Sequence, residues 1–254
     1  MPEEINRILT DSISDLLFCT EKSGVENLLS EGICPDKIYL VGHVMIDTLK
    51  RNMKIAGSST ILDQLHDKGC IDGDGFSVLT LHRPSNVDDP VVFSRILDAL
   101  EVIQDDLPII FPIHPRTRNN IISMNLHKRI DSLPRLHLID PIGYLDFLKL
   151  QSSARVVLTD SGGIQEETTV LNIPCITLRE NTERPVTVEM GSNQIVGTDT
   201  KKIVEAFRIV MNGNFRKSRV PPLWDGRAAE RIVEVIEQEF VGDKVEQFEA
   251  VQIG

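Results

Sequence analysis

Short runs of β-branched and aliphatic residues alternate with longer stretches of helical period along this 254-residue chain. Such alternation is typical of a parallel sheet whose strands are joined by crossover helices. Eight runs have the composition of buried strands. They span residues 16–19, 38–41, 77–81, 109–113, 136–139, 156–159, 174–177 and 194–196. The sequence therefore predicts an α/β protein.

The predicted strands divide at residues 54–75, where Gly, Ser and Asp clusters flank a helical stretch, as in many interdomain linkers. Residues 76–223 contain six strands and are predicted to form a complete Rossmann-like, doubly wound sheet. Residues 1–53 contain only two, and two buried parallel strands do not form a stable sheet alone. We therefore expect residues 1–53 to be the C-terminal remnant of a first Rossmann-like domain. A helix at 224–240 and an acidic tail at 241–254 complete the predicted organisation.

The charge and cysteine content limit the classes of partner. Lysine and arginine total 27 against 38 acidic residues, and the net charge of -11 disfavours electrostatic binding to nucleic acid or to an anionic membrane. No apolar run reaches about 18 residues, so no membrane span is predicted. The four cysteines form no CxxC pair, which favours neither a zinc site nor a disulfide framework. We expect a cytoplasmic protein with no metal and no cofactor.

The strongest local signal for a binding site follows the predicted strand at 156–159. Ser161, Gly162 and Gly163 come directly after this strand and open a new helix, with Glu167 near its start. Ligands of such folds lie beyond the carboxyl ends of the strands, and glycines at a helix N-terminus let backbone N–H groups approach a phosphate. The pattern fits a diphosphate. The alternative is a tight turn with an ordinary helix cap at Asp160 or Ser161.

Basic residues follow three other predicted strands. His82 and Arg83 come after the first strand of the second domain, His114 and Arg116 come after the next, and Arg184 follows the strand at 174–177. In a chain of negative net charge, solvated arginines should scatter without regard to strand ends, so this convergence favours an anion site. A histidine at a strand end is also a common structural hydrogen-bonding residue, and that reading of His82 stays open.

Five ordered motifs together resemble one enzyme family. They are Pro2-Glu3-Glu4 with Asn6-Arg7, HRPSNVD at 82–88, DP followed by YLDFL within 140–148, DSGGIQEE at 160–167 and RENTERP at 179–185. On these residues the chain resembles the non-hydrolysing UDP-N-acetylglucosamine 2-epimerases, which share the two-Rossmann-domain architecture of GT-B glycosyltransferases. Family members have a longer N-terminal half, so the resemblance implies the C-terminal portion of such an enzyme.

The resemblance implies a UDP-sugar substrate whose UDP moiety is held mainly by the second domain. It places Ser161, Gly162 and Gly163 at the diphosphate, Glu167 at the ribose hydroxyls, Phe147 at the uracil and Arg184 at the phosphate side. The residues that it assigns to catalysis are His82, which would contact the diphosphate as UDP leaves, and Glu3. Arg83, His114 and Arg116 are candidates for further basic contacts.

The implied reaction inverts C2 of UDP-GlcNAc by eliminating UDP to 2-acetamidoglucal and re-adding it, which gives UDP-ManNAc for surface polysaccharide. Alternatives are an epimerase of another UDP-HexNAc derivative, a hydrolysing 2-epimerase, a GT-B glycosyltransferase, and a non-catalytic nucleotide-sugar-binding fragment. For this chain alone we expect weak UDP binding, little turnover and self-association through an exposed sheet edge. For the full-length enzyme we expect a homodimer.

Overall fold

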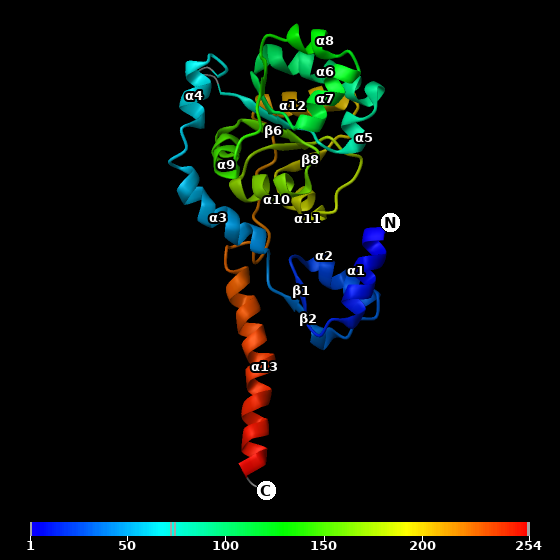
Figure 1. Ribbon diagram of the computed structural model, residues 1–254, viewed down its shortest axis with the longest axis vertical. Coiled ribbons are helices and arrows are strands. Elements are labelled where there is room, and N and C mark those ends of the chain that lie inside the picture. The colour runs from blue at the N-terminus through cyan, green and yellow to red at the C-terminus, as the bar shows by residue number, and fades with distance from the viewer. Residues whose placement is uncertain (1, 72, 74, 253–254) are drawn as a thin grey trace. The chain divides into compact units, whose positions relative to one another are not determined.

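A computed structural model of the chain describes residues 2–71, 73 and 75–252, with side chains for residues 4–71, 73 and 75–240. The chain divides into two compact units (Figure 1). Unit 1 comprises residues 1–50 and 221–254, and unit 2 comprises residues 51–220. Each unit contains its own cluster of buried apolar side chains.

Unit 2 is built on a six-stranded parallel sheet. Its strands are β3 (Ser77–Thr80), β4 (Ile109–Pro112), β5 (Leu136–Ile139), β6 (Val156–Thr159), β7 (Cys175–Thr177) and β8 (Asn193–Ile195). They lie in the order β5-β4-β3-β6-β7-β8. The chain adds strands in one direction from β3 to β5, then crosses to β6 and adds them in the other direction. In such sheets, ligands bind at the carboxyl ends of the strands where the order reverses, which here is between β3 and β6.

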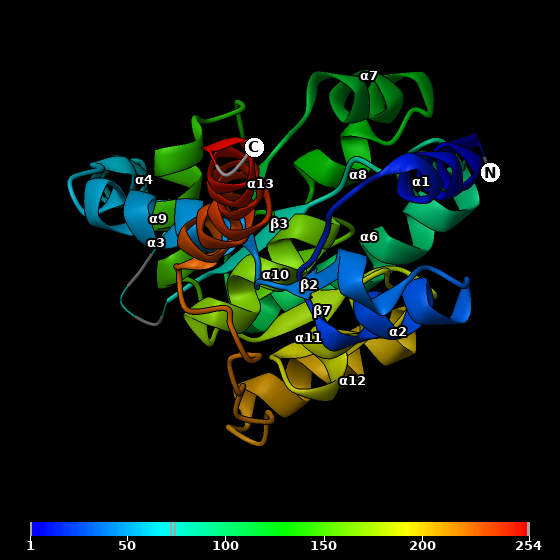
Figure 2. The same cartoon turned by 90° about the horizontal axis from the view of Figure 1, so that it is seen from below.

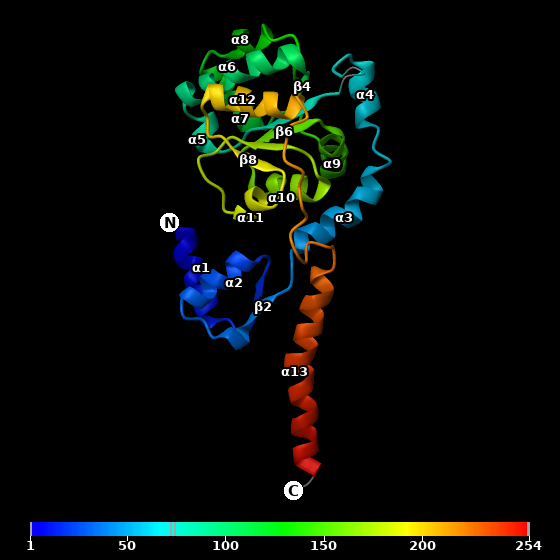
Figure 3. The same ribbon diagram turned by 180° about the vertical axis from the view of Figure 1, so that it is seen from behind.

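Helices cover both faces of this sheet. They are α4 (Ile61–Asp67), α5 (Pro84–Val87), α6 (Pro90–Asp106), α7 (Pro115–Ser123), α8 (His127–Asp131), α9 (Tyr144–Ser153), α10 (Gly162–Leu171), α11 (Pro185–Glu189) and α12 (Thr200–Met211). On one face α6 and α12 lie side by side, as Figure 3 shows from behind. On the other face α4 lies beside α9 (Figures 1 and 2).

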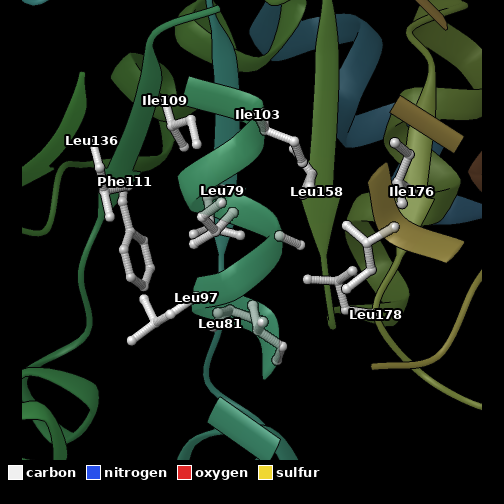
Figure 4. Close-up of a cluster of buried hydrophobic side chains, with 14 of the residues drawn as sticks. Leu79, Leu81, Leu97, Ile103, Ile109, Phe111, Leu136, Leu158, Ile176 and Leu178 are labelled. Carbon is white, nitrogen blue, oxygen red and sulfur yellow. The ribbon is translucent and has the colours of Figure 1, made fainter. Parts of the chain in front are cut away.

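The alternation of side chains along each strand divides the core of unit 2 between these two faces. Leu79, Phe111 and Leu158 lie in the cluster that includes residues of α6 and α12 (Figure 4). Val78 and Val157 lie in the cluster that includes residues of α4 and α9. All five are almost fully buried, and burial of each such side chain contributes about 1.5–3 kcal/mol. The packed sheet therefore fixes the positions at which the loops at its edge begin.

Unit 1 contains a two-stranded parallel sheet and helices from both ends of the chain. Its elements are α1 (Pro2–Ile13), β1 (Leu17–Cys19), α2 (Lys22–Ser30), the 3-10 turn Pro35–Lys37, β2 (Ile38–Leu40), α3 (Val44–Ala56), which runs into unit 2, and α13 (Ala228–Gln252). Asp47 accepts hydrogen bonds from the backbone N–H groups of Ala228 and Ala229, at 3.1 and 2.8 Å. Because these donors have no partner inside α13, the carboxylate caps that helix.

The eight predicted strands are confirmed, each within one residue of its predicted bounds. The division of the chain differs from the predicted one. The segment 54–75 contains α4, whose Ile61 and Leu65 are buried in the core of unit 2, because apolar residues at this helical spacing need a covering surface. At the C-terminal end, α13 continues across the expected boundary at residue 240 and groups with residues 1–50.

Candidate functional site

Two loops that carry predicted site residues meet at the carboxyl edge of the sheet. β3 and β6 are paired neighbours, so the loops that follow them lie side by side. The first loop contains His82 and Arg83 and leads into α5, and the second contains Asp160 and Ser161 and leads into α10. The structure thus brings these two loops together at the carboxyl edge of the sheet, at the point where the strand order reverses.

Asp160 joins the two loops. Its fully buried carboxylate accepts hydrogen bonds from the backbone N–H groups of His82, at 3.0 Å, and Arg83, at 2.9 Å, and from Nδ2 of Asn86, at 3.3 Å. Oδ1 also lies 2.8 Å from Nδ1 of His82. A buried charge is tolerated only when it is paired and hydrogen-bonded, so these donors fix the β3 loop against the β6 loop. The side chain of His82 remains 48% exposed.

The first turn of α10 is open to an incoming anion. Ser161 is the N-cap residue, and its side chain makes no capping hydrogen bond. A Cβ on Gly163 would meet no atom within 4 Å, and one on Gly162 would meet only the Glu183 carboxylate, at 3.9 Å. Neither glycine has a positive φ. Contacts among the described residues therefore do not require glycine at these positions, whereas close approach of a phosphate to the helix N-terminus does.

Arg184 approaches α10 from the loop after β7. Its Nε nitrogen forms an ion pair with Glu166, whose side chain is only 5% exposed, while the side chain of Arg184 is 41% exposed. The guanidinium is thus anchored on one side and accessible on the other. Sequence interpretation predicted Arg184 at the site but assigned no role to Glu166 as its anchor.

Gln165 fixes the loop that carries Arg184. Its Oε1 accepts hydrogen bonds from Oγ1 of Thr182, at 2.6 Å, and from Nδ2 of Asn193, at 2.9 Å. Its Nε2 donates to the carbonyl oxygen of Ser161 at 3.1 Å. Gln165 is fully buried, and a satisfied buried network of this kind holds its members in one arrangement. The β6 loop, the β7 loop and β8 are therefore linked through one side chain.

Glu167 and Phe147, the predicted ribose and uracil residues, lie on two neighbouring helices. The Tyr144 hydroxyl on α9 donates to Oε1 of Glu167 on α10 at 2.9 Å. Burial raises the pKa of the Glu167 carboxyl, and the hydrogen bond from Tyr144 opposes this only in part. Phe147 is half-buried against the cluster that includes Ile164. A buried carboxyl group with a raised pKa, here on the helix that follows β6, is a common feature of ligand sites.

The other predicted basic residues have partners within the protein. His114 caps α7, because its Nδ1 accepts a hydrogen bond from the backbone N–H of Arg116 at 3.2 Å. Arg116 pairs with Asp88 at 2.5 Å. His114 and Arg116 follow β4 at the predicted sheet edge, but both side chains already bind neighbouring protein groups. The side chain of Glu3 lies outside the described residues.

A hollow of about 320 Å³ opens beside the β3 loop. Its lining residues are Arg83, Ser85, Asn86, Val92, Arg179, Glu180, Asn181 and Thr198. Nε of Arg83 and Nη1 of Arg179 are buried and have no hydrogen-bond partner in the described part of the chain. The two guanidinium groups lie 3.9 and 2.8 Å from Glu183, which balances part of their charge.

A larger hollow of about 690 Å³ lies in unit 1, but its charges do not suit a diphosphate. Arg7 on its wall is bound by three carboxylates, those of Glu4, Asp11 and Glu31, at 2.7, 2.8 and 2.7 Å. Acidic groups therefore outnumber the guanidinium there, and its donors are occupied. The part-exposed guanidinium of Arg184 lies instead at the sheet edge of unit 2.

Two other kinds of feature are absent from the described residues. None of the described helices has both the length and the apolar composition needed to cross a bilayer. The described His, Cys, Asp and Glu side chains form no group of three or more that could hold a metal ion.

Comparison with known proteins identifies the family. A sequence profile described as UDP-N-acetylglucosamine 2-epimerase matches residues 1–237. The chain belongs to the UDP-N-acetylglucosamine 2-epimerase family. The resemblance inferred from the five motifs is thereby confirmed.

The relatives within this epimerase family agree in fold. The UDP-N-acetylglucosamine 2-epimerase of Methanocaldococcus jannaschii is 43% identical over 238 residues, which are 93% of this chain and 64% of that protein. A crystal structure of the M. jannaschii enzyme in complex with UDP-GlcNAc and UDP matches with a TM-score of 0.80 at 41% identity, over 93% of this chain and 64% of that one. The parallel α/β fold of GT-B type is therefore confirmed.

One relative has a different stated substrate. The UDP-2,3-diacetamido-2,3-dideoxy-D-glucuronate 2-epimerase of Pseudomonas aeruginosa is 39% identical over 239 residues, or 93% of this chain and 63% of that protein. The chain thus spans less than two thirds of the length of these relatives.

Proposed function

We propose that unit 2 binds the UDP moiety of a UDP-sugar at the carboxyl edge of β3 and β6, and that the reaction it serves is the interconversion of UDP-GlcNAc and UDP-ManNAc, with little turnover by this chain alone. The observation that carries the proposal is the open first turn of α10, where Gly162 and Gly163 leave room that no described side chain fills. The M. jannaschii relative, whose structure contains UDP-GlcNAc and UDP, supports the choice of ligand.

The site residues have complementary roles in this proposal. Backbone N–H groups at Ser161, Gly162 and Gly163 hold the diphosphate, because a helix N-terminus presents unpaired donors and a positive dipole end. The exposed side of Arg184 adds a charged contact. Glu167 accepts from the ribose hydroxyls. Phe147 lines the uracil position.

The proposed chemistry is an elimination followed by a re-addition. A carboxylate base takes the C2 proton, and the electron pair of the C2–H bond forms a double bond between C1 and C2. The C1–O bond breaks at the same time, and its electron pair departs with the UDP oxygen. The product of this elimination is 2-acetamidoglucal. UDP then adds back to C1 while C2 takes a proton on the opposite face. His82 stands where it can donate to the departing diphosphate, and Glu3 is proposed as one of the carboxylates.

A second candidate substrate is a UDP-sugar that carries acetamido groups at both C2 and C3. The observation behind it is the P. aeruginosa relative, which acts on such a sugar by its name. That relative is 39% identical to this chain, which is close to the 43% of the M. jannaschii relative. The same nucleotide site serves both substrates, because the sugar substituents differ and the UDP does not. Competition between the two UDP-sugars for the purified chain would separate them.

We further propose a cytoplasmic location and a homodimeric full-length enzyme. The location is supported by the four cysteines, all of which are free thiols, as is usual in a reducing compartment. The dimer is proposed on the membership of the epimerase family.

The direct test is calorimetric titration of the purified chain with UDP and with uridine, together with an epimerisation assay on the same sample. We expect UDP to bind weakly but at least tenfold more tightly than uridine, with little turnover. Equal affinity for UDP and uridine would contradict a diphosphate site. Free UDP released in step with ManNAc would instead indicate the hydrolysing reaction.

A further inference from the structure

The pair formed by Asp160 and His82 has a consequence for the imidazole proton. Oδ1 of Asp160 and Nδ1 of His82 are 2.8 Å apart. A carboxylate oxygen accepts and does not donate when ionised, so a bare Nδ1 lone pair at this distance would be repelled. Nδ1 must therefore carry the proton, and Nε2 is left as the nitrogen available to a ligand.

The carboxylate is itself held in place by other donors. It is fully buried and accepts the backbone N–H groups of His82 and Arg83 and the Asn86 amide, while Asn86 also donates to the carbonyl oxygen of Leu178 at 2.9 Å. Asp160 therefore cannot turn away from the ring without breaking several hydrogen bonds. The ring of His82 is consequently fixed on one side and exposed on the other.

We propose that Asp160 is a positioning residue that sets the tautomer and orientation of His82 so that Nε2 faces the diphosphate. This inference deepens the proposed function and rests on it for the identity of the ligand. When the ring carries both protons, its Nε2–H donates to a phosphate oxygen, and a charge-assisted donor of this type is stronger than a neutral one. Among the described residues, Nε2 has no other hydrogen-bond partner.

The first test needs no ligand. The ring-nitrogen NMR shifts of His82 in the free chain, measured at a pH where the ring is neutral, report which nitrogen carries the proton. We expect the Nδ1–H form in the wild type and a shift toward the Nε2–H form in Asp160→Asn. An Nε2–H wild-type ring would overturn the proposal, even if the chain binds no UDP.

The second test is a double-mutant cycle on UDP affinity. Asp160→Asn keeps one oxygen for the backbone donors but presents an amide to the ring, and we expect it to weaken UDP binding at least tenfold. In a His82→Ala background the same substitution should change affinity less than twofold, because the residue through which Asp160 acts is gone. An equal loss in both backgrounds would mean that Asp160 only holds the loops together, and would overturn the proposal.

The matched control is Asp140→Asn. Asp140 directly follows β5 at the same sheet edge, is 89% exposed and pairs with Arg118. The substitution removes the same charge at a residue that does not contact His82. It should therefore leave the ring tautomer unchanged and the UDP affinity within twofold of wild type. If wild type binds no UDP, the proposed function fails, while the tautomer measurement still decides the role of Asp160.

Discussion

At the scale of single residues, the candidate site combines groups that the fold does not need with groups that lower its stability. Gly162 and Gly163 start a helix without a positive φ or a close protein contact. Glu167 is buried enough to raise the pKa of its carboxyl. Natural proteins tolerate such choices mostly where function demands them.

Gly163→Ala separates ligand binding from stability. A methyl group at this position meets no protein atom within 4 Å, and alanine is favoured over glycine in a helix by about 0.5–1 kcal/mol. We expect denaturant unfolding to show equal or higher stability, while calorimetry shows UDP binding weakened about tenfold or more. Gly73→Ala, also in open space but in the segment that precedes β3, should leave UDP affinity unchanged. Unaltered affinity in Gly163→Ala would place the diphosphate elsewhere.

Glu167→Gln tests the buried carboxyl through pH. Burial raises the pKa of Glu167 in the folded state above its unfolded value. The folded chain therefore holds this proton more tightly, and the resulting stabilisation is present at acid pH and is lost as the pH rises through the folded-state pKa. Relative to Glu167→Gln, wild type should lose stability in urea unfolding as the pH rises above about 4.5, the ordinary value for a glutamate carboxyl. The same pH dependence of stability in the two proteins would contradict this. Separately, UDP affinity should fall about tenfold at pH 7 in the variant, because the ribose hydroxyls lose their charged acceptor.

At the scale of elements, the strands were predictable and the contacts between their loops were not. Strands such as Val156–Thr159 are short, apolar and bounded by turn residues, so local pattern determines them. Helix α4 was visible as a helical stretch, but its burial depends on α9, which lies more than 75 residues later. Asp160, considered only as a helix cap, instead binds a loop that precedes it by 77 residues in the sequence. Partners at such separations leave no local signal.

Gln165→Leu should loosen the element that carries Arg184. The change leaves Asn193 and Thr182 without their buried acceptor, and such unsatisfied groups cost about 1–3 kcal/mol. We expect a loss of stability of that size in urea unfolding, and weaker UDP binding because Arg184 is no longer held. Gln64→Leu on the exposed side of α4 is the control. Full stability in Gln165→Leu would show that the network does not fix this loop.

At the scale of the whole molecule, unit 1 leaves an unusual amount of apolar surface uncovered. Ile5, Leu9 and Ile13 of α1 are 59%, 60% and 83% exposed, and Ile8 beside them is also exposed. β1 pairs with β2 on one edge and with no other described strand. Apolar stripes and unpaired strand edges promote association. The eight strands and an exposed sheet edge were expected from the sequence, whereas the exposed apolar side chains of α1 became visible only in the structure.

The chain should therefore self-associate through unit 1. We expect sedimentation velocity to show an average mass that rises with protein concentration, and Leu9→Ser with Ile13→Ser to reduce that rise without changing net charge. Val91→Ser removes an equally exposed apolar side chain, 58% accessible, from unit 2 and should leave the rise intact. A wild-type chain that stays monomeric at all concentrations would contradict the expectation.

In the proposed complex, the first turn of α10 receives the diphosphate of UDP. Backbone amide NMR of the chain during titration with UDP, with uridine as the control, detects this contact at the residues that make it. We expect the amide signals of Gly162 and Gly163 to shift and saturate with UDP, together with that of His82, and to shift far less with uridine. Unchanged glycine signals, or shifts confined to the residues around Arg7 that line the hollow in unit 1, would contradict it.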